Sequence, residues 1–323
     1  MPTTLTMTVS HPEVLEGLRE VGVPDGVRLA LWDIAERPEL DGDLDVVVVP
    51  NYGATPDLLR RVAKVPGLRL VQLPSAGYEH ALAHIPEHVT VCNGRGVHDA
   101  GTAELALALT LASQRGIDDA VRDMADGLWR PVLRSSLADR RVMVLGYGSI
   151  GAAVGRRLEA FEADVVRVAR TAREAPEGHV HGIDEVYGLL GGVDVVIAVL
   201  PLTEQTDRLV DARMLAALPD GALVVNVGRG RVVDTAALLV ELQAGRLRAA
   251  LDVTDPEPLP ADHPLWRAPN TVITPHVGGY TDATTPRLVD LLRRQLEALM
   301  AGREPLNVVR AGLSAATGTT RAR

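Results

Sequence analysis

The stretch Val142-Met143-Val144-Leu145-Gly146-Tyr147-Gly148-Ser149-Ile150-Gly151 joins an apolar run to a GxGxxG turn and passes directly into helix-forming sequence. In a dinucleotide-binding unit, the first glycine allows the tight turn, the second lets the backbone approach a pyrophosphate, and the third lets helix and strand pack closely. The helix N-terminus then faces the anion. A lone GxGxxG is a weak signal, but this strand-to-helix context favours a dinucleotide site.

The end of the next predicted strand indicates which dinucleotide is bound. An acidic residue there would hold the 2′-hydroxyl of NAD, but Asp164 opens this strand and Ala169 closes it. Arg170, Thr171 and Arg173 follow, and such a group suits a 2′-phosphate. The sequence therefore favours NADP(H) and leaves NAD(H) open. The alternative is that these arginines are solvated surface in an arginine-rich chain.

Length and composition narrow the class of protein. At 323 residues the chain corresponds to about two domains. A charged fraction of 23% and a hydrophobic fraction of 46% are ordinary for a globular protein. The net charge of −9 argues against a nucleic acid or an anionic membrane as the main partner.

Cysteine content and the N-terminal sequence indicate the compartment. Cys92 is the only cysteine, which excludes an internal disulfide and a multi-cysteine metal site and fits a reducing cytosol. The N-terminus lacks a signal-peptide pattern, and no apolar run is long enough to span a bilayer. We therefore expect a cytoplasmic protein that has no bound metal.

Short β-branched runs alternate with helical patterns, which predicts an α/β protein with two largely parallel, doubly wound sheets. The strands expected in the first sheet are Leu5–Val9, Val27–Leu31, Val46–Val49, Leu68–Leu73 and Val89–Val91. Those expected in the second are Val142–Leu145, Val165–Ala169, Val193–Leu200, Ala222–Val227, Ala249–Val253 and Val272–Ile273. Long helices are expected over Thr102–Leu128 and Pro286–Met300.

Polar side chains follow the last three strands of the second series, where open α/β sheets bind ligands. Arg229 lies between glycines, where its planar fork suits a carboxylate, although a purely structural arginine fits there equally well. Asp252 and Glu257 lie in a Pro-rich segment that, taken alone, is an ordinary loop. His276 lies between Pro275 and a glycine pair, and a nearby carboxylate would favour its protonated form. Such a coincidence at three strand ends indicates a site for acid–base chemistry.

With Arg229, Glu257 and His276 and several further motifs, the chain resembles the D-isomer-specific 2-hydroxyacid dehydrogenases over nearly its whole length. The motifs are Ser75-Ala76-Gly77, Thr102-Ala103-Glu104-Leu105, the Gly146 turn, Pro201-Leu202-Thr203, Asn226–Gly230, Leu251–Pro260, Pro264-Leu265-Trp266 and Thr274–Gly279. Within the family the chain looks closest to the glyoxylate and hydroxypyruvate reductases, chiefly because Ala169-Arg170-Thr171 replaces the usual acidic strand end.

The resemblance implies two Rossmann-like domains. A discontinuous, flavodoxin-like substrate-binding domain would comprise residues 1–100 and 286–323, and a dinucleotide-binding domain would comprise residues 101–285. It also implies a homodimer formed through the cofactor domain, with Trp129 as a candidate interface residue.

The resemblance further implies a role for each matched residue. Arg229 would bind the substrate carboxylate and polarise its keto oxygen, while His276, paired with Glu257, would donate the proton as hydride arrives from the nicotinamide. Substrate-binding residues would be Tyr52, Ala76, Gly77 and Arg229, although Tyr52 fits a packing role as well. Cofactor-binding residues would be Gly146, Gly148, Ser149, Ile150, Gly151, Arg170, Thr171, Leu200, Pro201, Thr206, Val227, Asp252 and Gly278.

The expected activity is therefore the NAD(P)-dependent reduction of a small 2-keto acid. Phe161 is the only phenylalanine, which disfavours a pocket for large aromatic substrates. A formate dehydrogenase would pair its histidine with glutamine, so Glu257 argues against it. Two alternatives stay open: a phosphite dehydrogenase, whose expected lysine Lys64 does not match well, and a non-catalytic NAD(P)(H)-sensing protein.

Overall fold

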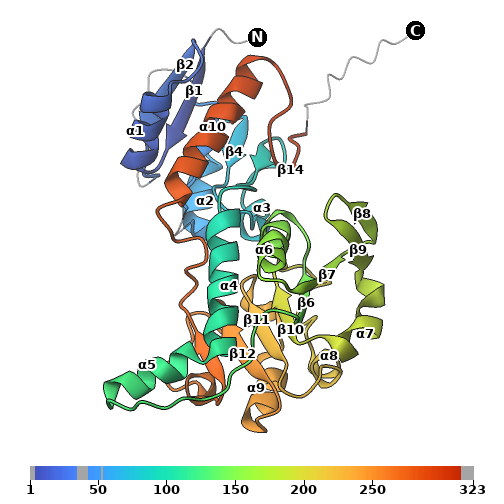
Figure 1. Ribbon diagram of the computed structural model, residues 1–323. Coiled ribbons are helices and arrows are strands. Elements are labelled where there is room, and N and C mark those ends of the chain that lie inside the picture. Colours follow the sequence, from blue (N-terminus) through green and yellow to red (C-terminus); the bar gives the residue numbers. More distant parts are fainter. Residues whose placement is uncertain (1–3, 35–42, 52–53, 314–323) are drawn as a thin grey trace, which may run out of the picture. The chain divides into compact units, whose positions relative to one another are not determined.

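The computed structural model describes residues 4–34, 43–51 and 54–313. The chain forms two compact units: Met1–His98 with Asp282–Arg323, and Asp99–Thr281. Each unit has one sheet with helices on it, which confirms the predicted two-sheet α/β architecture (Figure 1). The sequence predicted domain boundaries after residues 100 and 285. In the structure, the compact units are divided after residues 98 and 281.

The sheet of the first unit has the strand order β14-β5-β4-β3-β1-β2. Its strands are β1 (Leu5–Val9), β2 (Val27–Leu31), β3 (Val46–Val48), β4 (Leu70–Gln72), β5 (Thr90–Cys92) and β14 (Val308–Arg310). The first five pair in parallel in the 2-1-3-4-5 order of a flavodoxin-like fold. Strand β14 joins antiparallel to β5 at the edge.

Helices cover both faces of this sheet. On one face, α1 (Pro12–Val21) and α10 (Thr284–Met300) pack against each other and bury Leu18 and Leu292 with Met7 of β1. On the other face, α2 (Pro56–Val62) and α3 (Glu79–Leu82) bury Val62 and Ala81 in a second cluster. The late helix α10 therefore belongs to the core of the N-terminal unit.

The sheet of the second unit has the order β13-β12-β11-β10-β6-β7-β9-β8. Its strands are β6 (Arg141–Leu145), β7 (Asp164–Ala169), β8 (Arg173–Ala175), β9 (Gly178–Gly182), β10 (Val195–Ala198), β11 (Leu223–Asn226), β12 (Arg248–Leu251) and β13 (Thr271–Ile273). The run from β9 to β12 reproduces the 3-2-1-4-5-6 order of a Rossmann fold, with the switch point between β6 and β10. The GxGxxG turn therefore follows the strand at the switch point.

Alternating side chains of β6 supply both cores of the second unit. Val142 and Val144 face α4 (Asp99–Arg115) and α6 (Ser149–Ala160), whereas Met143 and Leu145 face the opposite side of the sheet. The helices on that opposite side are α7 (Val186–Leu189), α8 (Ala212–Ala216) and α9 (Thr235–Gln243). Short 3-10 turns complete the unit at Ile183–Glu185, Leu190–Gly192, Gly230–Val232 and Pro264–Arg267.

The structure differs from the sequence-based prediction in two places. The predicted helix Thr102–Leu128 is broken at Gly116, whose φ of 62° is left-handed, and continues as α5 (Ile117–Ala125). In Figure 1, α5 and the segment after it extend away from the sheet of their unit. Strands β8, β9 and β14 were not predicted, because they are short and lack an apolar run.

None of the helices in the described part of the chain combines the length and apolar character needed to cross a bilayer.

Candidate active site

The GxGxxG turn has the geometry that a dinucleotide needs. A Cβ on Gly146 would lie 2.6 Å from the Val199 carbonyl oxygen, and one on Gly151 would lie 2.3 Å from that of Gly146. Gly148, in contrast, faces open space. The first and third glycines therefore pack the turn, while the second leaves room for a pyrophosphate at the N-terminus of α6, whose first amides have no partner inside the helix.

The loop after β10 lies beside this turn and is closed by Thr206. Its hydroxyl donates to the Pro201 carbonyl at 2.6 Å and accepts from the Thr203 amide at 2.8 Å. Leu200, at the start of the loop, lies against both glycine segments: its side chain faces Gly146, and its backbone faces Gly228. The loop thus fixes Leu200 and Pro201 next to the turn.

Arginines surround the end of β7. Arg170 and Thr171 are exposed, and Arg170 forms no hydrogen bond or ion pair within the described residues. Arg173 instead donates from Nη2 to the Tyr147 carbonyl at 2.6 Å, so it holds the glycine turn. Among the described residues at this strand end, Arg170 is thus exposed and has no ion-pair partner.

Asn226, at the end of β11, shapes the loop that carries Arg229. Its buried side chain donates from Nδ2 to the Arg229 carbonyl at 2.9 Å and accepts from the Gly228 amide at 3.1 Å. Gly228 has no room for a Cβ, because the Leu200 carbonyl oxygen would lie 2.7 Å away. Arg229 is half-buried, and its guanidinium donates from Nη1 to the Gly228 carbonyl at 2.7 Å.

Asp252, just after β12, organises the loop that carries His276. This carboxylate is only 2% exposed and accepts from Thr274 Oγ1 at 2.7 Å and from the amides of Val277 and Gly278, both at 2.9 Å. The His276 amide also donates to the Asp252 carbonyl at 2.8 Å. These bonds hold His276 in a left-handed conformation with φ of 53°.

Glu257 and His276 form a direct pair. The distance from Glu257 Oε1 to His276 Nδ1 is 2.5 Å, and the two side chains are 41% and 44% exposed. Gly230, next to Arg229, packs against the segment that leads to Glu257, because a Cβ on Gly230 would approach the Thr254 carbonyl oxygen to 1.8 Å. Since β11, β12 and β13 are parallel neighbours, Arg229, Glu257 and His276 all follow the carboxyl ends of adjacent strands.

In the first unit, the loop after β4 presents two backbone amides. Ser75 Oγ donates to the Gly77 carbonyl at 2.8 Å, and Asn93 Nδ2 donates to the Ala76 carbonyl at 2.7 Å. Within the described residues the amides of Ala76 and Gly77 themselves donate no hydrogen bond. Successive backbone amides in a turn can form a concave anion site.

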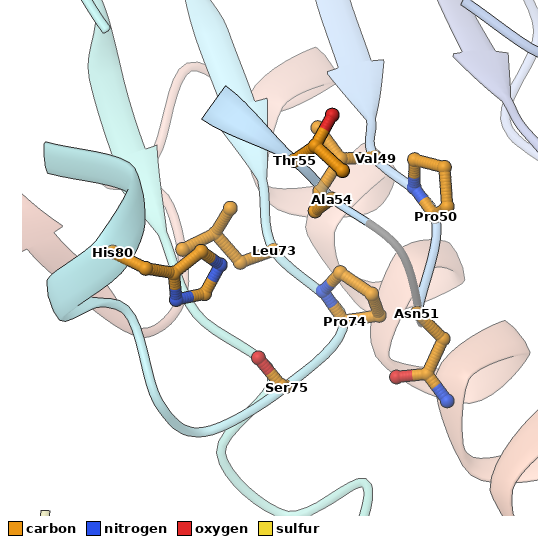
Figure 2. A pocket seen from close by; sticks show the side chains of 9 residues that line it. All are labelled: Val49, Pro50, Asn51, Ala54, Thr55, Leu73, Pro74, Ser75 and His80. Carbon is orange, nitrogen blue, oxygen red and sulfur yellow. The ribbon is translucent and has the colours of Figure 1, made fainter. Parts of the chain in front are cut away.

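A cavity of about 300 Å³ lies next to this loop in the same unit (Figure 2). Its wall consists of Val49, Pro50, Asn51, Ala54, Thr55, Leu73, Pro74, Ser75 and His80. The lining is mostly apolar, and the Oδ1 atom of Asn51 is buried without a hydrogen-bond partner among the residues that the structure describes. Tyr52, which the sequence assigned to the substrate pocket, lies outside the described residues.

Comparison with known proteins identifies the family. Residues 107–278 match the D-isomer specific 2-hydroxyacid dehydrogenase NAD-binding domain. The chain belongs to this family. The second unit is therefore the cofactor unit, and the chain is an oxidoreductase of the 2-hydroxyacid dehydrogenase type, as the sequence predicted.

Named relatives point in the same direction. The chain is 32% identical to a glyoxylate reductase of Korarchaeum cryptofilum over 76% of each chain. It is also 32% identical to a glyoxylate/hydroxypyruvate reductase A of Arabidopsis thaliana, over 81% of this chain and 84% of the relative. The match to named reductases does not favour either alternative function, the phosphite dehydrogenase or the non-catalytic sensor.

Solved structures of the 2-hydroxyacid dehydrogenase family share the fold. The Xanthobacter autotrophicus enzyme in complex with NADPH and MES aligns with a TM-score of 0.78 at 30% identity, over 95% of this chain and 98% of that one. The NADPH-dependent glyoxylate/hydroxypyruvate reductase of Sinorhizobium meliloti, in complex with NADP and sulfate, aligns with a TM-score of 0.79 at 25% identity. This alignment covers 96% of this chain and 100% of that one.

Sequence reasoning missed the residues that position the site. Asn226, Thr274 and Asn93 each hold a functional loop through side-chain hydrogen bonds. Asn226 and Asn93 had a recognisable signal, because each is a polar residue at the end of a buried strand. Thr274 had none, since threonine is common near strand ends.

Proposed function

We propose that this 2-hydroxyacid dehydrogenase reduces a small 2-keto acid, glyoxylate or hydroxypyruvate, with NADPH as the preferred cofactor. The observation that carries the proposal is the 2.5 Å Glu257–His276 pair, which follows strands β12 and β13 next to the strand end that bears Arg229. The names of the relatives support the substrate class.

In this proposal, His276 is the proton donor. Its Nδ1 faces Glu257, which leaves Nε2 to face the keto oxygen. The carboxylate orients the ring, and a proton donor positioned in this way contributes about 10²–10⁴-fold in rate. The nicotinamide, when bound, supplies the hydride.

Arg229 is proposed to bind the substrate carboxylate and to stabilise the negative charge that develops on the keto oxygen. Its guanidinium is always charged and presents several donors in one plane. Asn226 and the Gly228 backbone fix its loop in advance, so little reorganisation is needed as charge develops. The amides of Ala76 and Gly77 are proposed to donate to the substrate carboxylate as well.

The NADPH preference is proposed from the end of β7. Arg170 is exposed and has no partner within the described residues, so it can contact a 2′-phosphate, with Thr171 as a hydroxyl donor. Relatives of known structure hold NADPH or NADP, which supports the same preference.

We further propose that the enzyme is a cytoplasmic homodimer. Trp129 and Leu133 are 96% and 99% exposed in the segment after α5, and α5 itself contains no buried residue. An apolar surface of this kind on a soluble protein marks an interaction site. A second copy of the chain covers it in this proposal.

The first experiment measures turnover of glyoxylate, hydroxypyruvate, pyruvate and phenylpyruvate with NADPH and with NADH. We expect the fastest turnover with NADPH and one of the first two acids. Arg170→Ala should lower kcat/KM for NADPH by about 10- to 100-fold, since a hydrogen bond to a charged group contributes about 1.5–3 kcal/mol. It should leave NADH turnover unchanged.

The matched control is Arg19→Ala, which removes an exposed arginine from α1 in the other unit. Equal losses with both cofactors in Arg170→Ala would contradict the assignment of Arg170. Absence of turnover on all four acids, with NADPH still bound, would contradict the proposed activity.

A further inference from the structure

The β8–β9 hairpin and the 3-10 turn after it gather two histidines and two glutamates outside the active site. His179 and His181 are two residues apart on β9, so both side chains leave the same face of the strand. Val180 between them is fully buried on the opposite face. Glu185 follows in the 3-10 turn, and Glu174 lies directly opposite His179 on β8.

Specific contacts hold these side chains together. His179 Nδ1 lies 2.7 Å from Glu174 Oε1, and His181 Nδ1 lies 2.8 Å from Glu185 Oε2. The two imidazole rings meet edge to face, with their centroids 4.7 Å apart. The other oxygen of Glu185 accepts from the Gly182 amide at 2.8 Å, which fixes the carboxylate beside the strand.

The spacing of the donor atoms suits a small cation. One ligand atom each from His179, His181 and Glu185 lies within 4.8 Å of the others. Tetrahedral zinc bound at about 2.0–2.2 Å needs ligand atoms about 3.3 Å apart. Because these side chains are exposed or half-buried, small side-chain rotations can bring the atoms closer without moving the backbone.

The chemistry of the donors selects the metal. Two imidazoles and a carboxylate suit Zn²⁺ and its neighbours among the late transition metals, whereas Mg²⁺ and Ca²⁺ prefer oxygen ligands alone. Glu174 lies against Nδ1 of His179. A carboxylate in this position strengthens a metal site, either by accepting a hydrogen bond from the histidine ring or by acting as a fourth ligand.

We infer that His179, His181 and Glu185, supported by Glu174, form a binding site for Zn²⁺ that is separate from the active site. This inference departs from the sequence-based expectation of a protein without bound metal, in which the two histidines were not considered because they lie on a strand that was not predicted. Bound Zn²⁺ would join β8, β9 and the 3-10 turn at the edge of the sheet next to β7. This inference does not depend on the proposed substrate or on the cofactor preference.

Calorimetric titration of the chelator-treated full chain with zinc chloride tests the inference. The double variant His179→Asn/His181→Asn should lose one site that the unsubstituted chain has. Glu174→Gln should weaken that site about 10-fold, as expected when a supporting carboxylate is removed. Two control variants should keep it: His88→Asn, at an exposed position of the first unit, and His276→Asn, which removes the active-site histidine.

Amide hydrogen exchange provides the second measurement. Added Zn²⁺ should slow exchange within residues 173–185 and leave the segment Thr274–Gly278 unchanged. Equal zinc isotherms for the unsubstituted chain and the double variant, when both unfold at the same temperature without metal, would overturn the inference. Loss of the site in His276→Asn would also overturn it, because the zinc would then lie in the active site.

Discussion

At the scale of single residues, the contact between Glu257 and His276 leads to a prediction about rate. Glu257 Oε1 lies 2.5 Å from His276 Nδ1 and so orients the ring that is proposed to donate the proton. In Glu257→Gln this orienting carboxylate is lost, so kcat/KM for keto-acid reduction should fall by about 10²-fold, which is within the range that positioned proton transfer contributes. Steady-state kinetics with saturating NADPH measure the change.

Glu304→Gln is the control for this substitution, because it changes an exposed glutamate near the end of α10 in the other unit. Its kcat/KM should match that of the unsubstituted enzyme. Should Glu257→Gln keep the same kcat/KM as well, Glu257 does not orient His276 for proton transfer.

Asp252 makes a prediction about stability. Three donors converge on its buried carboxylate, and an asparagine amide would place an NH₂ group against at least one of them. Asp252→Asn should therefore lower the free energy of unfolding of the cofactor unit by about 1–3 kcal/mol. Urea unfolding followed by circular dichroism measures the loss, and Asp262→Asn, at an exposed position, is the control. Equal stability of the two variants would mean that an amide satisfies the same donors.

Cys92 is predicted to be inert in the folded enzyme. Burial raises the pKa of its thiol to about 11, and the side chain is inaccessible to solvent. At pH 8 only about one thiol in a thousand would be ionised, and the thiolate is the form that reacts. Iodoacetamide should therefore label Cys92 only after the first unit opens in denaturant. Stoichiometric labelling within minutes under native conditions, with the circular dichroism unchanged, would refute this prediction.

At the scale of elements, the β6-turn-α6 segment allows two glycines to be compared. Gly148→Ala adds a methyl group where the structure has open space, so the fold should tolerate it while NADPH binding weakens at least tenfold. Gly151→Ala adds the same group 2.3 Å from the Gly146 carbonyl oxygen. Forced overpacking of this kind costs about 1–3 kcal/mol.

Thermal unfolding and NADPH titration of both variants make the comparison. The expected result is weak binding at normal stability for Gly148→Ala and a lower unfolding temperature for Gly151→Ala. If Gly148→Ala binds NADPH normally, the pyrophosphate does not pass against Gly148.

The sequence predicted those elements whose signal is local. Strand β6, its glycine turn and α6 were predicted because a continuous apolar run followed by spaced glycines reflects short-range geometry. Strand β9 was not, because Gly178-His179-Val180-His181-Gly182 has one buried apolar residue and depends on pairing with β7 and β8. The same reason applies to β14, which is a strand only because β5 lies beside it.

The candidate site residues also divide into those with a local sequence signal and those without one. Arg229, Glu257 and His276 were proposed from their positions after predicted strands. The hydrogen bonds of Asn226 and Thr274 could not be predicted, because each joins side chain and backbone in a geometry that only the folded loops define. The break at Gly116 was missed because the sequence on both sides of it favours helix.

At the scale of the whole molecule, the arm formed by α5 and the segment after it makes a prediction about assembly. Trp129, Leu133 and Met124 are highly exposed on this arm. The enzyme should therefore elute as a dimer in size-exclusion chromatography with light scattering. Trp129→Glu/Leu133→Glu should shift it toward the monomer, because two buried charges would oppose association. A dimer that persists in this variant would place the interface elsewhere.

The discontinuous first unit also determines the order in which a nascent chain can mature. Residues 1–98 leave the ribosome before α10 and β14, which cover one face of their sheet and extend its edge. Until then, the cluster that contains Met7 and Leu18 lacks its α10 members, such as Leu292. The cofactor unit is continuous and can fold first, since domains generally fold as units. During synthesis, the core of the first unit therefore stays incomplete until α10 has been made, later than the whole of the cofactor unit.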